Sequence, residues 1–258
     1  MHYDWSTVGG PSSGLTTVGS GTSLTLSVAG EILDHVRSTV RTIAEATGTG
    51  ATNCVIDDTF RADGDNLLLS HCSVAQGVSG AGSYTVQYNF ITSDADGMDP
   101  TGPGQKLIQY NKIWRDGSRV GENHQDGIQF WQGGNTVISR NYITGWQTSA
   151  INLKANIGAI SNVTIDSNYL GNPTGYYQLY LCPDIHGITN VTVTNNAFAK
   201  ANYVVSTCGT KITFVHSEAQ RQAAIAAGNQ AAANWVVWNN NYVAGTNTVV
   251  TPPGGWVE

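Results

Sequence analysis

The stretch GENHQDGIQFW, residues 121–131, combines a histidine, two acids, two glutamines and a tryptophan within eleven residues. A histidine exchanges protons near neutral pH, and carboxylates hold cations or take part in acid–base catalysis. An indole ring next to polar side chains is a common way to hold a sugar ring, because one part of it is apolar and the other polar. Whether these groups act together depends on the elements that position them.

A short pattern of alternating apolar residues followed by Asn recurs along the chain. The repeated residues are Asn89, Asn111, Asn141, Asn168, Asn196 and Asn241. Their successive spacings are 22, 30, 27, 28 and 45 residues. A period in the twenties with variable insertions is typical of a solenoid, and the β-branched alternation within each unit indicates strands. An Asn at the same place in every coil predicts a ladder of amides that hydrogen-bond between neighbouring coils.

A second strand is expected after each Asn, in segments such as HQDGIQ (124–129), QTSAIN (147–152) and GYYQLY (175–180). At least two strands per coil predict an all-β fold, a right-handed parallel β-helix. In such a solenoid each coil buries its inward residues only by stacking on its neighbours. A β-sandwich is the alternative, but it gives no reason for a regular Asn position.

Two segments depart from the repeat. SEAQRQAAIAAG (217–228) begins with a Ser-x-x-Gln capping box and ends at Gly, which predicts a short helix beside the solenoid. GEILDHVRSTVRTIAEATG (30–48) has apolar residues on one helical face and predicts a helix that caps the N-terminal end, with strands as the alternative. Residues 1–29, rich in Gly, Ser and Thr, are expected to form an extended attachment or oligomerisation segment before a single domain, residues 30–258.

The four cysteines test this register. Aligning YQLYLC (177–182) with YVVSTC (203–208) places Cys182 directly beneath Cys208 on the next coil. Adjacent strands lie about 4.8 Å apart, which is within reach of a disulfide, so we predict a Cys182–Cys208 bridge. Cys54 and Cys72 do not align in this register and are either buried free thiols or a second bridge. A bridge implies an oxidising environment.

Side chains alternate along a strand, so the register also groups the outward-facing residues. One outward column contains Asp99, Gln129, Asn152, Tyr180 and Ser206. A neighbouring column contains Trp131 and Lys154. Polar and aromatic side chains therefore follow the axis of the solenoid on one face, as a groove for a linear polymer would. For Lys154, alone on a strand, a solvated charge is favoured over a catalytic base.

The turn before these strands stacks further charged groups. Asp96 is expected over Asp126, and Asp94 over His124. The loop WRDGSRVGENHQ is expected to add Arg115 and Arg119 to the rim of the same face. Each Asp-Gly is equally explained as a turn in which the Asp caps backbone amides, and His124 as a surface loop residue.

Composition narrows the classes of partner. The net charge is −6 with only 12 Lys and Arg, so no nucleic-acid partner is expected, because such binding relies on clustered basic residues. No apolar run approaches the roughly 20 residues that span a bilayer, so no membrane insertion is expected. The first residues, MHYDWSTVGG, have neither a basic start nor an apolar segment, so no secretory signal is visible.

The coil pattern and the Asn positions, over about residues 50–250, resemble the right-handed parallel β-helix proteins of the pectate-lyase-like superfamily. This superfamily includes polysaccharide lyases, uronan epimerases, polygalacturonase-type hydrolases and phage tailspikes. The resemblance is specific for the fold and weak for the activity.

One motif of the hydrolases can be compared residue by residue. Polygalacturonases have Asn-Thr-Asp-Gly-Ile and then Gln-Asp-Asp on the next coil. The segment NHQDGI (123–128) is similar to the first motif, but the next coil has Gln147, Thr148 and Ser149, without either acid. The paired acids that hydrolysis requires are missing, so the hydrolase interpretation is mostly excluded.

The lyases and epimerases imply a cation that neutralises a uronate carboxylate, and a base that removes the neighbouring proton. By this resemblance, Ca²⁺ would be held by Asp94, Asp96 and Asp126. The catalytic residues would be His124, Asp126 and Lys154. The substrate would be bound by Asp99, Arg115, Arg119, Gln129, Trp131, Asn152 and Tyr180.

Two functions remain open at this point. The first is recognition, with depolymerisation or epimerisation, of an acidic polysaccharide along the middle coils. The second is a non-catalytic glycan-binding spike or fibre of a virion or cell surface, which the resemblance implies is a homotrimer. Both place the protein outside the cell or on a virion surface.

Overall fold

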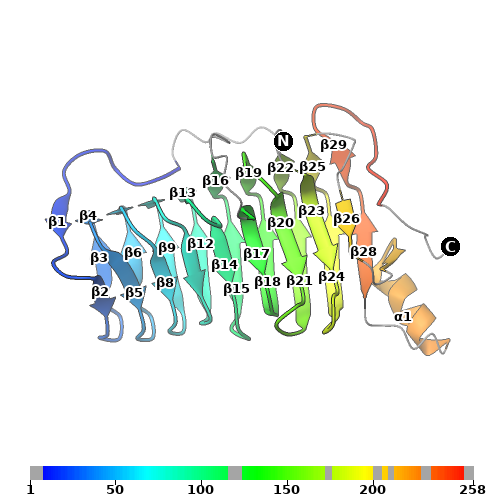
Figure 1. Cartoon of the computed structure of the whole chain (residues 1–258), viewed down its shortest axis with the longest axis horizontal. Coiled ribbons are helices and arrows are strands. Elements are labelled where there is room, and N and C mark those ends of the chain that lie inside the picture. The colour runs from blue at the N-terminus through cyan, green and yellow to red at the C-terminus, as the bar shows by residue number, and fades with distance from the viewer. Residues whose placement is uncertain are drawn as a thin grey trace.

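The computed structural model describes residues 8–115, 124–171, 176–199, 205–208, 212–227 and 234–252. Within these ranges the chain winds into an elongated solenoid whose three sheets run along its axis (Figure 1). Neighbouring strands in each sheet come from successive coils, and every named strand pairs with its neighbours in parallel. The all-β class and the right-handed parallel β-helix are thus confirmed.

The three sheets are named A, B and C here. Sheet A contains β1 (Thr16–Val18), β4 (Val36–Ser38), β7 (Val55–Ile56), β10 (Ser73–Val74), β13 (Phe90–Ile91), β16 (Lys112–Trp114), β19 (Tyr142–Thr144), β22 (Tyr169–Gly171), β25 (Ala197–Phe198) and β29 (Tyr242–Val243). Sheet B contains β2 (Ser23–Leu26), β5 (Arg41–Ala44), β8 (Phe60–Ala62), β11 (Val78–Gly80), β14 (Met98–Pro100), β17 (Asp126–Phe130), β20 (Ser149–Lys154), β23 (Tyr177–Cys182) and β26 (Val205–Thr207). Sheet C contains β3 (Ile32–Asp34), β6 (Gly50–Thr52), β9 (Leu67–Ser70), β12 (Tyr84–Gln87), β15 (Lys106–Gln109), β18 (Gly133–Ser139), β21 (Ile160–Asp166), β24 (Ile188–Thr194), β28 (Trp235–Asn239) and β27 (Thr213–Val215).

The core is built from inward side chains that stack coil upon coil. On sheet B, for example, Val78, Met98, Ile128, Ile151 and Leu179 lie in register on five successive strands. All five are essentially excluded from solvent. Because this column fixes which residues face inward, it also fixes the outward column beside it.

The predicted asparagine ladder is confirmed. Its members are buried and lie at the corner between sheets C and A: Asn89, Asn111, Asn141, Asn168, Asn196 and Asn241. The Asn141 Oδ1 accepts hydrogen bonds from the backbone N–H of Asn111 at 2.9 Å and from its Nδ2 at 3.0 Å. The Asn141 Nδ2 in turn donates to the Ile108 carbonyl of the preceding coil at 2.9 Å. Each amide therefore ties neighbouring coils together through both its donor and its acceptor.

Cys54 and Cys72 continue this ladder toward the N-terminus, so the prediction that they do not align was wrong. The Cys72 N–H donates to the Asn89 Oδ1 at 2.8 Å, as the ladder asparagines do. The register of β10 with β7 places Cys72 directly beside Cys54. The Cys72 thiol donates to the carbonyls of Ser70 and Ala51, which correspond to the carbonyls that accept from the ladder amides. Both thiols are free.

The residue before each ladder position has a left-handed backbone. The φ angles are 58° at Tyr88, 57° at Tyr110 and 56° at Arg140. This conformation is uncommon for side chains other than Gly, Asn and Asp, and it persists here because the ladder hydrogen bonds fix the chain on its C-terminal side. The result is the same sharp corner in every coil. The side chains at the corner stack as well, with the Tyr88 and Tyr110 ring centroids 5.0 Å apart.

The capping helix expected over residues 30–48 is absent, since this segment forms β3, β4 and β5. Strands β1 and β2, within residues 1–29, pair with β4 and β5, so residues 16–26 belong to the solenoid. The Thr and Val residues of this segment favour strands. Each of the three strands then hydrogen-bonds to a strand of the next coil. The local sequence pattern cannot reveal this pairing, because the partner strands lie on other coils.

The lateral helix is confirmed as α1 (Glu218–Ala226), which lies beside the C-terminal end of the solenoid (Figure 1). The Ser217 side chain caps it by accepting the Gln220 N–H at 3.1 Å. The Gln220 side chain reaches back to accept the His216 N–H at 2.8 Å. Within the described ranges no helix is long and apolar enough to cross a lipid bilayer.

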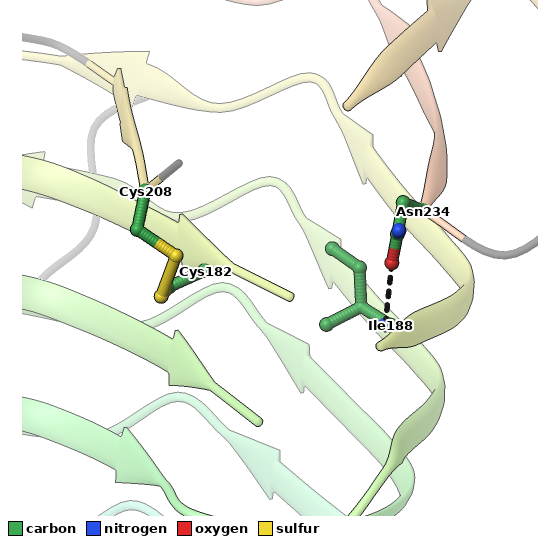
Figure 2. Close-up of a disulfide and its surroundings, with 4 residues drawn as sticks. All are labelled: Cys182, Ile188, Cys208 and Asn234. Carbon is green, nitrogen blue, oxygen red and sulfur yellow. Dashed lines mark hydrogen bonds between the residues drawn. A yellow bond between two sulfur atoms is a disulfide. The ribbon is translucent and has the colours of Figure 1, made fainter. Parts of the chain in front are cut away.

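The predicted disulfide between Cys182 and Cys208 is also confirmed, with the two Cα atoms 4.9 Å apart (Figure 2). It links the end of β23 to the residue after β26 on the next coil. Nearby, the Asn234 side chain accepts the Ile188 N–H at 3.0 Å and joins the following coil to β24 (Figure 2). The last coils are therefore held by a covalent bond as well as by strand pairing.

We predict that Asn141→Ala destabilises the solenoid by at least about 2 kcal/mol. The change leaves the buried N–H and amide donors of Asn111 without an acceptor, and each buried unpaired group costs about 1–3 kcal/mol. Chemical denaturation measures the loss as a lower midpoint. The control is Asn247→Ala at an exposed position, and equal midpoints for the two variants would contradict the role of the ladder.

Candidate functional site

The outward column of sheet B has the predicted register. Met98 pairs with Ile128, which places Asp99 beside Gln129. Gln129 pairs with Asn152, and Asn152 pairs with Tyr180. Residues separated by more than 20 positions in the sequence thus become direct neighbours on one face of the solenoid.

A hollow of about 320 Å³ lies over β17, β20 and β23 on this face. We call it the Trp131 pocket. Its lining residues are His124, Gln129, Trp131, Thr148, Asn152, Lys154, Tyr176, Tyr177 and Tyr180. Six of these are residues that the sequence proposed for a site: His124, Gln129, Trp131, Asn152, Lys154 and Tyr180. Thr148 was not predicted. It lies one residue before Ser149, and because Ser149 pairs with Tyr177, the register would have placed Thr148 at the pocket.

Aromatic rings form much of this pocket. The Tyr177 and Tyr180 rings stack with centroids 5.4 Å apart, and Tyr176 next to them is largely exposed. The Lys154 Nζ lies 5.9 Å from the centroid of the Trp131 ring, a cation–π distance. The pocket therefore combines apolar ring surfaces with one fixed positive charge.

The inner wall contains two amides, Gln129 and Asn152, and a buried carboxylate orients the second. Gln129 and Asn152 are only 2% and 4% exposed, although both line the pocket. The Asn152 Nδ2 donates to the Asp126 Oδ2 at 2.9 Å, and the Ser149 hydroxyl donates to the other oxygen. The Asn152 Oδ1 has no hydrogen-bond partner in the described part of the chain. The Asp126 carboxylate, with no exposed surface, holds the Asn152 amide in place and does not itself line the pocket.

Two further carboxyl groups lie next to Asp126. The Asp96 Oδ1 accepts the Asp126 N–H at 2.8 Å, which confirms that Asp96 lies over Asp126. Burial, together with the nearby charges of Asp126 and Asp99, raises the pKa of Asp96 to about 7. Burial raises the pKa of Asp99 to about 6. It also raises the pKa of Asp126, although the hydrogen bonds from Ser149 and Asn152 oppose this shift.

Two of the acids expected to hold calcium have hydrogen-bond partners within the protein. Among the described residues, no group of three or more His, Cys, Asp or Glu side chains is arranged to hold a metal ion. The Asp96 carboxylate accepts a backbone N–H, and Asp126 is enclosed by Ser149 and Asn152. Calcium binding by Asp94, Asp96 and Asp126 stays a prediction from the resemblance.

The two arginines expected on the rim have different outcomes. Arg115 is 6% exposed and donates from Nη1 to the Ser93 carbonyl at 2.9 Å. Its guanidinium lies 6.0 Å from the ring centroid of the buried Trp146. Arg115 is thus a buried residue away from the Trp131 pocket, and its expected rim position was wrong. Arg119 lies outside the described residues.

Among the comparisons with known proteins, the comparison with solved structures supports the fold. Neither a protein-family model nor a curated protein matches the chain. The crystal structure of the Dettilon tailspike protein is similar, with a TM-score of 0.52 and 13% sequence identity. The alignment covers 89% of this chain and 54% of the tailspike, so the chain spans about half the length of that protein. The fold defined above is therefore one that a tailspike also has.

The raised carboxyl pKa values predict that ionisation of Asp96 destabilises the protein. An unfolded Asp titrates near pH 4, whereas Asp96 titrates near 7 when folded, so the folded state binds this proton more tightly. The associated stability is fully present below about pH 4 and is lost as the pH rises toward 7.

Thermal melting of wild type and Asp96→Asn tests this. We expect equal melting temperatures near pH 4 and a higher one for the variant at pH 8, because the amide does not ionise. Asp65→Asn, at an exposed position, is the control and should melt like wild type throughout. A variant that melts below wild type at pH 8 would contradict the assignment.

Proposed function

We propose that this protein recognises a polysaccharide along the outward face of sheet B, centred on the Trp131 pocket. The observation that carries the proposal is the meeting of aromatic rings and oriented amides in one hollow: Trp131, Tyr177 and Tyr180 beside Gln129 and Asn152. Ring faces match the C–H faces of sugars, and amides match their hydroxyl groups.

The inner wall supports this proposal because its polar groups are fixed before a ligand arrives. Asp126 and Ser149 form a hydrogen-bonded support behind Asn152, whose Oδ1 is without a partner among the described residues. Preorganised polar groups lose little conformational entropy on binding.

The proposed setting is an extracellular or virion-surface spike. The Cys182–Cys208 disulfide supports an oxidising environment, and the similar solved structure is named a tailspike. Structural similarity at 13% sequence identity supports only the fold. The functional part of the proposal therefore rests on the residues of the Trp131 pocket. The homotrimer that the sequence resemblance implied stays a prediction.

We predict that Trp131→Ala weakens glycan binding at least about tenfold, since a stacked aromatic contact contributes on the order of 1 kcal/mol beyond its buried area. The measurement is binding of fluorescent protein to an array of bacterial capsular and O-antigen polysaccharides, followed by titration of the best ligand. Trp114→Ala on sheet A is the matched control and should bind like wild type. Binding to no glycan on the array, or equal losses in both variants, would contradict the proposal.

A second candidate function is cleavage or epimerisation of the bound glycan. The observation that favours it is that His124, whose imidazole can accept a proton, and Lys154, whose ammonium can donate one, line the same pocket as the aromatic rings. In this scheme Asp126 acts as a positioning residue, because its carboxylate contacts Ser149 and Asn152. Abstraction of the proton next to a uronate carboxylate gives either an unsaturated product or the epimer.

For this candidate, we expect His124→Ala and Lys154→Met to abolish the ultraviolet absorbance that develops on alginate, pectate or hyaluronan, with or without added Ca²⁺. Lys112→Met is a matched control, because Lys112 also lies over aromatic rings but on sheet A. Proton NMR of the polymers reports epimerisation, which leaves absorbance unchanged. Wild-type protein that alters none of these polymers or the array ligand would leave recognition alone as the function.

A further inference from the structure

A second hollow, of about 430 Å³, lies on sheet B toward the N-terminal end of the solenoid. We call it the arginine pocket. Its lining residues are Arg41, Thr59, Arg61, Asp63, Ser79, Gly80, Ala81, Asp99 and Thr101. We infer that this pocket binds the carboxylate of an acidic sugar in the same glycan chain that the Trp131 pocket holds. The inference rests on the proposed function and adds to it the chemical class of the ligand.

The two pockets lie on one continuous face. Arg61, Ser79 and Asp99 precede Gln129 and Asn152 in the outward column of sheet B. Asp99 lines the arginine pocket, and its neighbour Gln129 lines the Trp131 pocket. Four strand steps separate Arg61 on β8 from Asn152 on β20, or about 19 Å at the usual strand spacing. A linear polymer lying along the axis therefore meets both pockets, whereas a single sugar meets one.

Two guanidinium groups give the arginine pocket its specificity. Arg41 on β5 and Arg61 on β8 are diagonal neighbours, because Ile43 pairs with Arg61. The Arg61 Nε contacts the Asp63 Oδ2 at 2.6 Å, which fixes that guanidinium while about half of its side chain stays exposed. In the described part of the chain no carboxylate pairs with Arg41. A guanidinium can bind a carboxylate through two parallel hydrogen bonds, so Arg41 offers a geometry that matches a uronate.

The remaining lining residues suit the rest of a sugar ring. Thr59, Ser79 and Thr101 supply hydroxyl groups that donate and accept hydrogen bonds. Gly80 and Ala81 contribute little bulk, and a Cβ at Gly80 would lie 2.0 Å from the Ala62 carbonyl oxygen, so a larger residue cannot occupy this place. The hollow thus has polar walls and a small-residue edge.

Asp99 makes the proposed binding sensitive to pH. Its half-buried carboxyl lines the arginine pocket, and its Oδ1 is without a partner among the described residues. Since its pKa is raised to about 6, Asp99 is neutral in mildly acidic solution and can then donate a hydrogen bond to the ligand. Above that pH its charge repels a uronate. The titratable groups around it are the pocket's Arg41, Arg61 and Asp63, together with Asp96 and Tyr84, since the charge of Asp99 helps to raise the pKa of both.

The experiment is an NMR titration of the full chain with glucuronate and, separately, with glucose. We expect glucuronate to shift the Nε–Hε signals of Arg41 and Arg61, and glucose to leave them unchanged. Arg41→Gln and Arg61→Gln should each raise the dissociation constant for glucuronate at least fivefold. Arg37→Gln is the matched control, because Arg37 forms an exposed ion pair with Asp57 on sheet A and should bind like wild type.

The pH arm compares pH 5 with pH 7.5, where glucuronate is ionised throughout. Wild type should bind more tightly at pH 5, and Asp99→Asn should show a smaller preference for pH 5, because Asp96 still ionises between the two pH values. An equal response to glucose and glucuronate, or undiminished glucuronate binding by the Arg41→Gln, Arg61→Gln double variant, would overturn the inference.

The two proposals fail separately. If Trp131→Ala keeps wild-type affinity for the array ligand while glucuronate still shifts Arg41 and Arg61, the proposed function fails and the carboxylate site stands. If Trp131→Ala loses the array ligand while glucuronate shifts neither arginine, recognition stands and the acidic-sugar site is overturned.

Discussion

Stacking of parallel coils is the constraint on which the rest of this structure depends, and the asparagine ladder is where it is enforced. Each ladder amide is buried, so its donors and acceptor must find partners inside the protein. The partners lie one coil away, as between Asn111 and Asn141. Because each ladder residue after Asn89 accepts the same pair of donors, a backbone N–H and a side-chain amide, a shift of one residue would leave several buried groups unpaired. The ladder therefore sets the register of all three sheets, and insertions between coils are accommodated in the turns.

The candidate site is a consequence of that register. Gln129, Asn152 and Tyr180 come from three coils, and only their alignment on sheet B makes them one wall. Tyr177 and Tyr180 stack within one strand, β23, whereas the pairing of β20 with β17 places Lys154 beside Trp131. The proposed glycan path follows the solenoid axis because each coil contributes one outward side chain per column. A surface of this kind can contact successive units of a polymer along its length.

Buried carboxyl groups distinguish the middle coils from the others. Asp96, Asp99 and Asp126 lie close together on β14, β17 and the turn before β14, and each has a raised pKa. Burying an acid costs free energy unless it is neutralised or hydrogen-bonded, and the hydrogen bonds of Asp126 go to Ser149 and to Asn152 of the pocket wall. Asp126 thereby orients Asn152, and Asp99 lies where the two pockets meet. The free-energy cost of burial is thus concentrated at the face for which we propose a ligand.

The sequence by itself determined the period, the inward and outward alternation, and the residues that stack at the ladder. These were enough to predict the parallel β-helix, the Cys182–Cys208 bridge and six residues of the Trp131 pocket, because coil stacking converts a linear period into contacts. The tertiary structure alone decided the rest. Residues 30–48 fit a helical period as well as strands, and only pairing with adjacent coils makes them β3, β4 and β5. Cys54 and Cys72 have no side-chain amide and so do not match the repeated Asn. Their thiols nevertheless donate to the carbonyls that a ladder asparagine would use. The burial of Arg115 against Trp146 and the meeting of Arg41 with Arg61 depend on how turns and columns pack in three dimensions, which no local pattern specifies.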